Sequence, residues 1–247
     1  MAKAEKERLD ARVLREHPHL TRNQVQGFII QGKVLVDGKA NTKSGTQITA
    51  ENVVELTIQD PKFVSRAGFK LEEALKQFGV DVTGLTVVDA GISTGGFTDC
   101  LLQQGAKRVY GVDVGYGQVH EKIRTDPRVV LLEKTNLRLL ERLPEQVDLA
   151  TLDLSFISLL KVMPAIKNLL KPDGRIIALI KPQFEAERHE VSRGGVIKED
   201  AIHQRIIQQI KAGMEEFGFT LVHVIESPIV GATSGNKEFL GYFVSKK

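Results

Sequence analysis

The stretch VVDAGISTGGFTD, Val87 to Asp99, is an apolar run that reaches an acid and then breaks into a glycine-rich turn before a helical segment. A buried strand followed by such a turn is typical of the ligand-binding edge of a doubly wound α/β sheet. The glycines at positions 91, 95 and 96 have the spacing G-x-x-x-G-G. This spacing limits the ligands that the turn can hold.

Two common phosphate-binding turns do not fit. The dinucleotide fingerprint G-x-G-x-x-G uses its second glycine to let the backbone approach a pyrophosphate, and the spacing G-x-x-x-G-G lacks this glycine. A Walker A loop requires Gly-Lys-Ser/Thr, whereas Phe97 and Thr98 follow Gly96. The turn therefore favours a ligand without a diphosphate.

A second strand-like run, RVYGVDV, has Asp113 next to its end, at a distance from the first glycine that suits an acid accepting the hydroxyls of a ribose. S-adenosylmethionine fits this combination, with Gly91 and Gly95 giving its amino-acid part room and Asp89 close to its cationic end. A turn that serves only the geometry of the fold is the alternative. The predicted cofactor-binding residues are Asp89, Gly91, Ser93, Gly95, Gly96, Phe97, Asp113, Asn136 and Asp153.

The hydrophobic pattern changes at Asp60-Pro61, which predicts a domain boundary. Before it, Leu9, Val13 and Leu14 have helical spacing, a second helix follows Thr21 as N-cap and ends at Gly32, and Asp37-Gly38 predicts a hairpin. After it, alternating strands and helices predict a doubly wound, mostly parallel sheet. We expect strands at Thr86–Ala90, Arg108–Val114, Val129–Leu132, Val147–Leu152, Arg175–Ile180, Thr220–Glu226 and Phe239–Val244, and helices at Arg66–Gly79, Gly96–Gln104, Leu159–Leu170 and Glu199–Phe217.

Composition excludes several classes of protein. The 247 residues are 42% hydrophobic and 26% charged, and no apolar run approaches the roughly 18 residues that a membrane span needs. The charged N-terminus has no secretory signal pattern, and Cys100, the only cysteine, can form no internal disulfide. We therefore expect a cytoplasmic protein without a membrane partner. The net charge of +3 says little about nucleic acids.

Several residues bear on the methyl acceptor. Cytosine C5 methylation needs a cysteine nucleophile, but Cys100 lies inside a predicted helix. Methylation of a base amino group typically uses a turn with two prolines after the acid, and both prolines are missing after Asp153. Lys181 ends the run RIIALIKP, at the edge where Asp153 is expected. An acid and a lysine there suit deprotonation of a hydroxyl, with Lys70 as a second cation that makes Lys181 less basic. The six histidines show no ligand spacing, so no metal site is predicted.

From Phe63 onward the chain resembles the FtsJ-like ribose 2′-O-methyltransferases, whose active site is a Lys-Asp-Lys-Glu tetrad. The matching positions are Lys70 in SRAGFKL, Asp153 in LDLSFISL, Lys181 in LIKPQFE and Glu238 in NKEFL. The resemblance implies that Lys181 is the general base, that Asp153 orients it, and that the other two residues position the ribose. Ile92 departs from the D-x-G-A/S turn usual in the family, which leaves cofactor affinity open.

The first sixty residues resemble an S4-like RNA-binding domain, through RLD at Arg8–Asp10 and TRNQVQGFIIQGKVLVDG at Thr21–Gly38. With the loop RGGVIKED at Arg193–Asp200, the whole layout is similar to the TlyA family, often labelled hemolysin A. The resemblance implies an α/β, Rossmann-like S-adenosylmethionine-dependent methyltransferase fold with a small N-terminal α+β S4-like domain. The expected boundaries are 1–59 for the S4-like domain, 60–65 for a linker and 66–247 for the methyltransferase domain.

The same resemblance implies 2′-O-methylation of ribosomal RNA at cytidine, within a ribosomal subunit or assembling particle. Basic residues of the first domain would contact phosphates, which position RNA without reading its bases. We expect these residues to be Arg8, Arg12, Arg22, Lys33 and Lys39. A hemolysin-like cytolytic protein and a non-catalytic RNA-binding assembly factor are the alternatives.

Overall fold

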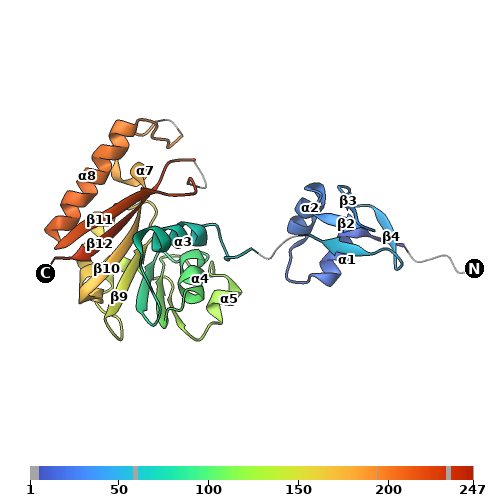
Figure 1. The fold of residues 1–247 in the computed structure, drawn as a ribbon, viewed down its shortest axis with the longest axis horizontal. Coiled ribbons are helices and arrows are strands. Elements are labelled where there is room, and N and C mark those ends of the chain that lie inside the picture. Colours follow the sequence, from blue (N-terminus) through green and yellow to red (C-terminus); the bar gives the residue numbers. More distant parts are fainter. Residues whose placement is uncertain (1–5, 58–60, 193, 232–234, 247) are drawn as a thin grey trace, which may run out of the picture. The chain divides into compact units, whose positions relative to one another are not determined.

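The computed structural model describes residues 6–57, 61–192, 194–231 and 235–246. The chain divides into two compact units, Met1–Lys62 and Phe63–Lys247 (Figure 1). The expected boundary at Asp60 and the first residue of the RGGVIKED loop, Arg193, lie outside the described residues.

The N-terminal unit is a small α+β domain built on two short helices. Thr21 caps the second helix through a capping box with Gln24, as its N-cap position predicted. Asp37 and Gly38 both have positive φ, 52° and 76°, the conformation of a tight hairpin turn. The elements are β1 (Lys6–Arg8), α1 (Leu9–Glu16), α2 (Arg22–Ile30), β2 (Val34–Val36), β3 (Lys39–Asn41), β4 (Gln47–Thr49) and β5 (Val54–Leu56).

A seven-stranded sheet forms the centre of the second unit, with the strand order β11-β12-β10-β9-β6-β7-β8. Neighbouring strands from β10 to β8 are parallel, and β12 is antiparallel to both β10 and β11. This arrangement confirms the predicted α/β fold with a mostly parallel sheet. The strands are β6 (Thr86–Ala90), β7 (Arg108–Val112), β8 (Val129–Leu132), β9 (Val147–Leu152), β10 (Leu170–Ile180), β11 (Phe219–Glu226) and β12 (Phe239–Ser245).

Helices cover both faces of this sheet because successive strand residues point to opposite sides. Val87 packs in the cluster that contains residues of α3 and α4, whereas Val88 packs in the cluster that contains residues of α6 and α8. The helices are α3 (Ala67–Phe78), α4 (Gly96–Gln103), α5 (Glu121–Arg124), α6 (Met163–Leu169), α7 (Pro182–Glu185) and α8 (Asp200–Glu216), with 3-10 turns η1 (Leu137–Leu139) and η2 (Leu159–Lys161).

The expected helix Leu159–Leu170 is wrong in part, since η2 and α6 replace it and Leu170 already belongs to β10. Pro164 explains the break, because a proline has no N–H for an interior helix bond and fits the first turn of a new helix.

The sheet register brings four chain segments to one edge. Ala90 pairs with Leu152, so the residues after β6 and β9 are neighbours. Ile180, the last residue of β10, pairs with Phe239, the first residue of the antiparallel β12. The residue that follows β10 and the residue that precedes β12 therefore meet at the same edge.

Candidate active site

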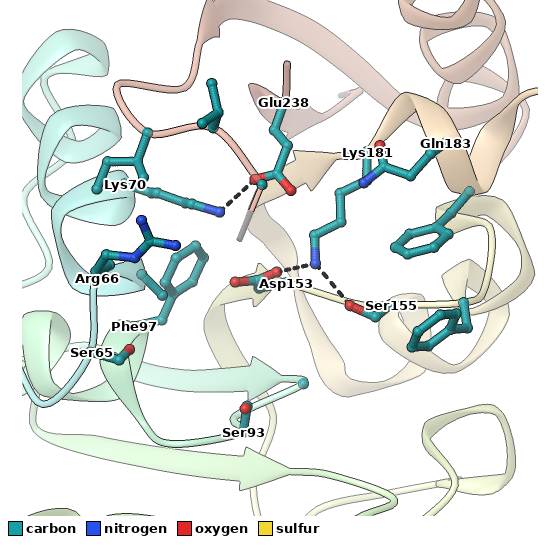
Figure 2. Close-up of a pocket in the computed structure, with 18 of the residues that line it drawn as sticks. Ser65, Arg66, Lys70, Ser93, Phe97, Asp153, Ser155, Lys181, Gln183 and Glu238 are labelled. Atoms are coloured by element: carbon teal, nitrogen blue, oxygen red, sulfur yellow. Dashed lines mark hydrogen bonds and ion pairs between the residues drawn. The ribbon is translucent and has the colours of Figure 1, made fainter. Parts of the chain in front are cut away.

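The four residues of the predicted tetrad line one cavity of about 580 Å³. Lys70 comes from α3, Asp153 follows β9, Lys181 follows β10 and Glu238 precedes β12. Figure 2 shows that they form two ion pairs, with Lys70 directed to Glu238 and Lys181 to Asp153.

Both ion pairs are close and largely buried. The Lys70 Nζ lies 2.5 Å from Oε2 of Glu238, and these side chains are 10% and 4% exposed. The Lys181 Nζ lies 2.6 Å from Oδ1 of Asp153 and donates a hydrogen bond of 3.0 Å to Oγ of Ser155. Each buried ammonium group thus has a carboxylate partner, which offsets the cost of removing its charge from water.

A second cavity, of about 310 Å³, opens beside the first. Asp113 and Asn136 lie in its wall, together with the apolar side chains of Val114, Leu137 and Ile157. The two cavities share the lining residues Gly91, Ser93, Asp153, Ser155 and Phe156. Asp153 therefore lies where the two cavities meet.

The glycine turn is shaped by close backbone contacts. Gly91 has φ +85°, and a Cβ at this position would lie 2.5 Å from the carbonyl oxygen of Asp153. A Cβ on Gly96 would collide with the Ser65 hydroxyl, and Gly95, the N-cap of α4, has φ +100°. Only glycine fits such a conformation and such a separation without strain.

Comparison with protein families agrees with this geometry. A family model described as FtsJ-like methyltransferase matches residues 63–244, and an S4 domain model matches residues 7–54. The chain belongs to the FtsJ-like methyltransferase family.

Relatives of this FtsJ-like methyltransferase match it along nearly its whole length. "Hemolysin A" of Brachyspira hyodysenteriae is 40% identical over 96% of this chain and 99% of its own length. The "16S/23S rRNA (cytidine-2'-O)-methyltransferase TlyA" of Mycobacterium tuberculosis is 42% identical over 96% of this chain and 89% of its own length.

Solved structures of other proteins also resemble this chain. A protein of Streptococcus thermophilus described as a hemolysin has a TM-score of 0.75 and 36% identity, covering 99% of this chain and 90% of its own. An S-adenosylmethionine-dependent methyltransferase of Listeria monocytogenes, at 19% identity, has a TM-score of 0.55 over 74% of this chain and 100% of its own. This second likeness shows the fold alone.

Most of the predicted cofactor residues line one of the two cavities of this FtsJ-like methyltransferase. Asp113 accepts backbone hydrogen bonds from Ser93, at 2.9 Å, and Gly115, at 2.7 Å, and Phe97 lines the larger cavity. Asn136 caps η1 by accepting a hydrogen bond from the Arg138 backbone N–H. Gly95 contributes to the turn but not to the lining of either cavity.

Asp89 lies beneath the turn rather than at a cavity surface. Its carboxylate is fully buried and accepts hydrogen bonds from the hydroxyls of Thr98, at 2.6 Å, and Thr151, at 3.0 Å. Burial disfavours the charged form and raises the pKa of Asp89 to about 6. Asp89 is absent from the described lining of both cavities. We expected it beside the cationic end of the ligand, but it lies beneath the residues that line the cavities.

The predicted RNA-binding residues differ in whether their basic side chains already form ion pairs within the protein. Arg8 donates two hydrogen bonds to Asp10, and Arg12 forms ion pairs with Glu7 and Glu16. Of the five predicted residues, the other three, Arg22, Lys33 and Lys39, have exposed side chains and form no ion pair with the described residues. The second group is therefore better placed to contact phosphates.

Several residues of the larger cavity were not predicted from the sequence. Ser65 and Arg66 come from the segment before α3, and Gln183 and Phe184 come from α7. Phe156 is 91% exposed with φ +64°, and its ring lies 5.0 Å from that of Phe184. The run PQFE directly follows the predicted base, Lys181, and its proline fits the first turn of a helix, but four residues are too few to show a helical period.

Within the described ranges, no helix has the length and apolar character of a membrane span. In the same part of the chain, His, Cys, Asp and Glu side chains form no group of three or more suited to a metal ion.

Proposed function

We propose that this chain transfers a methyl group from S-adenosylmethionine to the 2′-hydroxyl of a cytidine in ribosomal RNA, within a ribosomal subunit. The observation that carries the proposal is the position of Asp153 and Lys181. Asp153 belongs to both cavities, and the Lys181 ammonium group is held at this junction. A donor in one cavity and an acceptor in the other would meet there.

The smaller cavity has the chemistry that an adenosine requires. Asp113 offers carboxylate oxygens to a ribose diol, and Val114, Leu137 and Ile157 offer an apolar surface to a base. The backbone of the glycine turn at Gly91 and Ser93 lines the wall common to both cavities, where the amino-acid part would lie. The residues present therefore fit S-adenosylmethionine.

The bound donor would supply a methyl group activated by the positive charge of its sulfonium. Lys181, once neutral, would accept the proton of the 2′-hydroxyl, and Asp153 and Ser155 would fix its Nζ in position. The acceleration would come from positioning and electrostatics.

Lys70 and Glu238 would orient the ribose from the opposite wall. Their ion pair is more deeply buried than that of Lys181, so its geometry is well fixed. Glu238 neutralises the charge of Lys70, which supports a positioning role rather than the expected role of a free second cation. The names of the TlyA relatives support cytidine in ribosomal RNA as the acceptor.

The test is transfer of labelled methyl groups to ribosomal subunits purified from cells that lack this chain. We expect label in RNA at a cytidine, in a dinucleotide resistant to alkaline hydrolysis, because a 2′-O-methyl group blocks cleavage. No label in RNA with the intact chain, or label on a base, would refute the proposal. Lysis of erythrocytes without RNA methylation would instead support the cytolytic alternative.

A further inference from the structure

Arg66 is a charged residue of the larger cavity that is not paired with a carboxylate. It is exposed and lines the cavity, and its guanidinium forms no hydrogen bond or ion pair with the described residues. Other arginines of the same unit, such as Arg124 and Arg128, each lie against a carboxylate. The N–H donors of Arg66 are therefore available to a ligand in the cavity.

The other charges in the wall of this cavity cancel in pairs. Lys70 lies 2.5 Å from Glu238, and Lys181 lies 2.6 Å from Asp153. These four residues and Arg66 are the charged residues among the described ones that line the cavity. The described wall thus has a net charge of one positive unit, which is located on Arg66. A wall of this charge attracts an anionic ligand.

Arg66 lies on the side of the cavity that holds Lys70. It is the N-cap residue of α3, and Lys70 follows about one helical turn later. Figure 2 shows both side chains extending into the cavity from this helix, across from Lys181. Arg66 does not line the smaller cavity, where the adenosine of the donor would lie. Its guanidinium therefore faces the space that the acceptor nucleotide would occupy.

An acceptor nucleotide brings an anion to this space. In RNA, the ribose carbon next to the one that bears the 2′-hydroxyl is linked to a phosphate through its 3′ oxygen. A ribose with its 2′-hydroxyl at Lys181 and its ring near Lys70 therefore carries a negative charge only a few bonds away. The planar guanidinium of arginine binds phosphate oxygens through two parallel N–H groups.

We propose that Arg66 binds the phosphate on the 3′ side of the acceptor nucleotide and thereby holds the 2′-hydroxyl at Lys181. The inference rests on the proposed function and extends it from the reacting ribose to the RNA backbone. Because this phosphate adjoins the reacting group, the contact acts on the methyl-transfer step itself. Phosphate contacts of the N-terminal unit would act on docking of the RNA alone.

The experiment compares the intact chain with Arg66→Ala in single-turnover methylation of ribosomal subunits, at subunit concentrations raised to saturation. Arg66→Lys keeps the charge but loses the pair of parallel N–H groups. Arg66→Gln is a second neutral variant, used if the alanine variant has a lowered melting temperature. Titration calorimetry gives the affinity of each variant for S-adenosylmethionine.

Arg108→Ala is the matched control. Arg108 is also exposed and forms no ion pair with the described residues, but it begins β7, at the end of the strand away from the cavities, and lines neither of them. Its loss should leave both the methylation rate and the affinity for S-adenosylmethionine as they are in the intact chain.

At saturation, Arg66→Ala should transfer the methyl group about tenfold to a hundredfold more slowly, the usual effect of losing a hydrogen bond to a charged group. Arg66→Lys should have an intermediate rate, and the affinity for S-adenosylmethionine should be unchanged in both variants. The rate is the measurement that separates Arg66 from a docking residue, because docking is complete at saturation.

An unchanged saturating rate in a folded neutral variant would overturn the inference alone, even if more subunit were needed to reach it. A weaker affinity for S-adenosylmethionine would also overturn it, because the anion at Arg66 would then be the carboxylate of the donor. Absence of RNA methylation by the intact chain would refute the proposed function and this inference with it.

Discussion

Lys181 and Gly91 are linked through a single residue, because Asp153 pairs with the Lys181 Nζ at 2.6 Å while its carbonyl oxygen occupies the space beside Gly91 where a Cβ would lie. The position of the proposed base and the shape of the glycine turn are therefore coupled. Changes at either place should affect methyl transfer in different ways.

Lys181→Ala should lower the single-turnover rate of methyl transfer by about 10²–10⁴, the usual contribution of a positioned base. Lys181→Arg should not restore it, because a guanidinium stays protonated. The control is Lys171→Ala, which removes a lysine paired with Asp148 near the other end of β10. Full activity of the arginine variant would exclude Lys181 as the base.

Gly91→Ala should destabilise the protein and slow methyl transfer, because the new Cβ would collide with the Asp153 carbonyl. Gly84→Ala is a matched control, since Gly84 also has a positive φ, +74°, but has open space around a Cβ. The control should lose only about 1–2 kcal/mol of unfolding free energy, the cost of the left-handed conformation. Chemical denaturation of the two variants would show the difference, and equal losses would contradict the clash.

Asp113→Ala should weaken binding of S-adenosylmethionine by about 1–3 kcal/mol, the cost of leaving polar partners unmatched. The change also removes the acceptor for the Ser93 and Gly115 backbone N–H groups, so the melting temperature must be measured alongside. Titration calorimetry gives the affinity. The control is Asp81→Ala, which removes a similar turn acid outside both cavities and should leave the affinity for S-adenosylmethionine unchanged. If a folded Asp113 variant binds S-adenosylmethionine as tightly as the intact chain, Asp113 does not belong to the cofactor site.

Asp89 should make stability depend on pH in an unusual direction. Its pKa is raised to about 6 from 3.8 by burial, so its contribution is fully present below the pKa of the unfolded chain and is lost as pH rises through about 6. Relative to Asp89→Asn, the intact chain should lose about 2 kcal/mol of unfolding free energy between pH 4 and pH 7. Denaturation of both proteins across this range measures the effect, and a difference that does not vary with pH would disprove it.

Removal of Arg22, Lys33 and Lys39 together by alanine substitution should weaken binding to ribosomal RNA and reduce its salt dependence. Each lost phosphate contact on a duplex lowers the slope of log affinity against log salt by about 0.9. Arg12→Ala should change the slope less, because Arg12 is paired with Glu7 and Glu16. An unchanged slope in the triple variant would show that these three residues do not contact RNA phosphates.

The sequence predicted the elements whose signals are local and strong. The predicted bounds of β6 and β9 are the observed ones, because both strands are buried apolar runs. α5 and α7 were missed because each has only four residues, too few to show a helical period. β1 and β4 were missed because three-residue strands with polar side chains carry little pattern.

At the candidate site, the order of the strands predicted that Lys181 lies beside Asp153, as their ion pair of 2.6 Å shows, but it did not predict the pairing of the other two tetrad residues. No spacing in the sequence indicates that Lys70 contacts Glu238, 168 residues away, because this pairing depends on where β12 joins the sheet. Likewise, the composition of the turn could not reveal that Asp89 lies below the cavity surface. Both features depend on tertiary packing, which the residue pattern of one sequence does not predict.

The pairing of Ile180 with Phe239 means that the separation between Lys181 and Glu238 is set by ladder register and not by the length of chain between them. Insertions between α7 and α8 should therefore be tolerated, whereas a slip of β12 by one residue would turn Glu238 to the opposite face of the sheet. In design or evolution, a change of length in this segment would alter the wall of the larger cavity, which includes Val191, Gly194 and Gly195, and would leave the pairing of β10 with β12 in place.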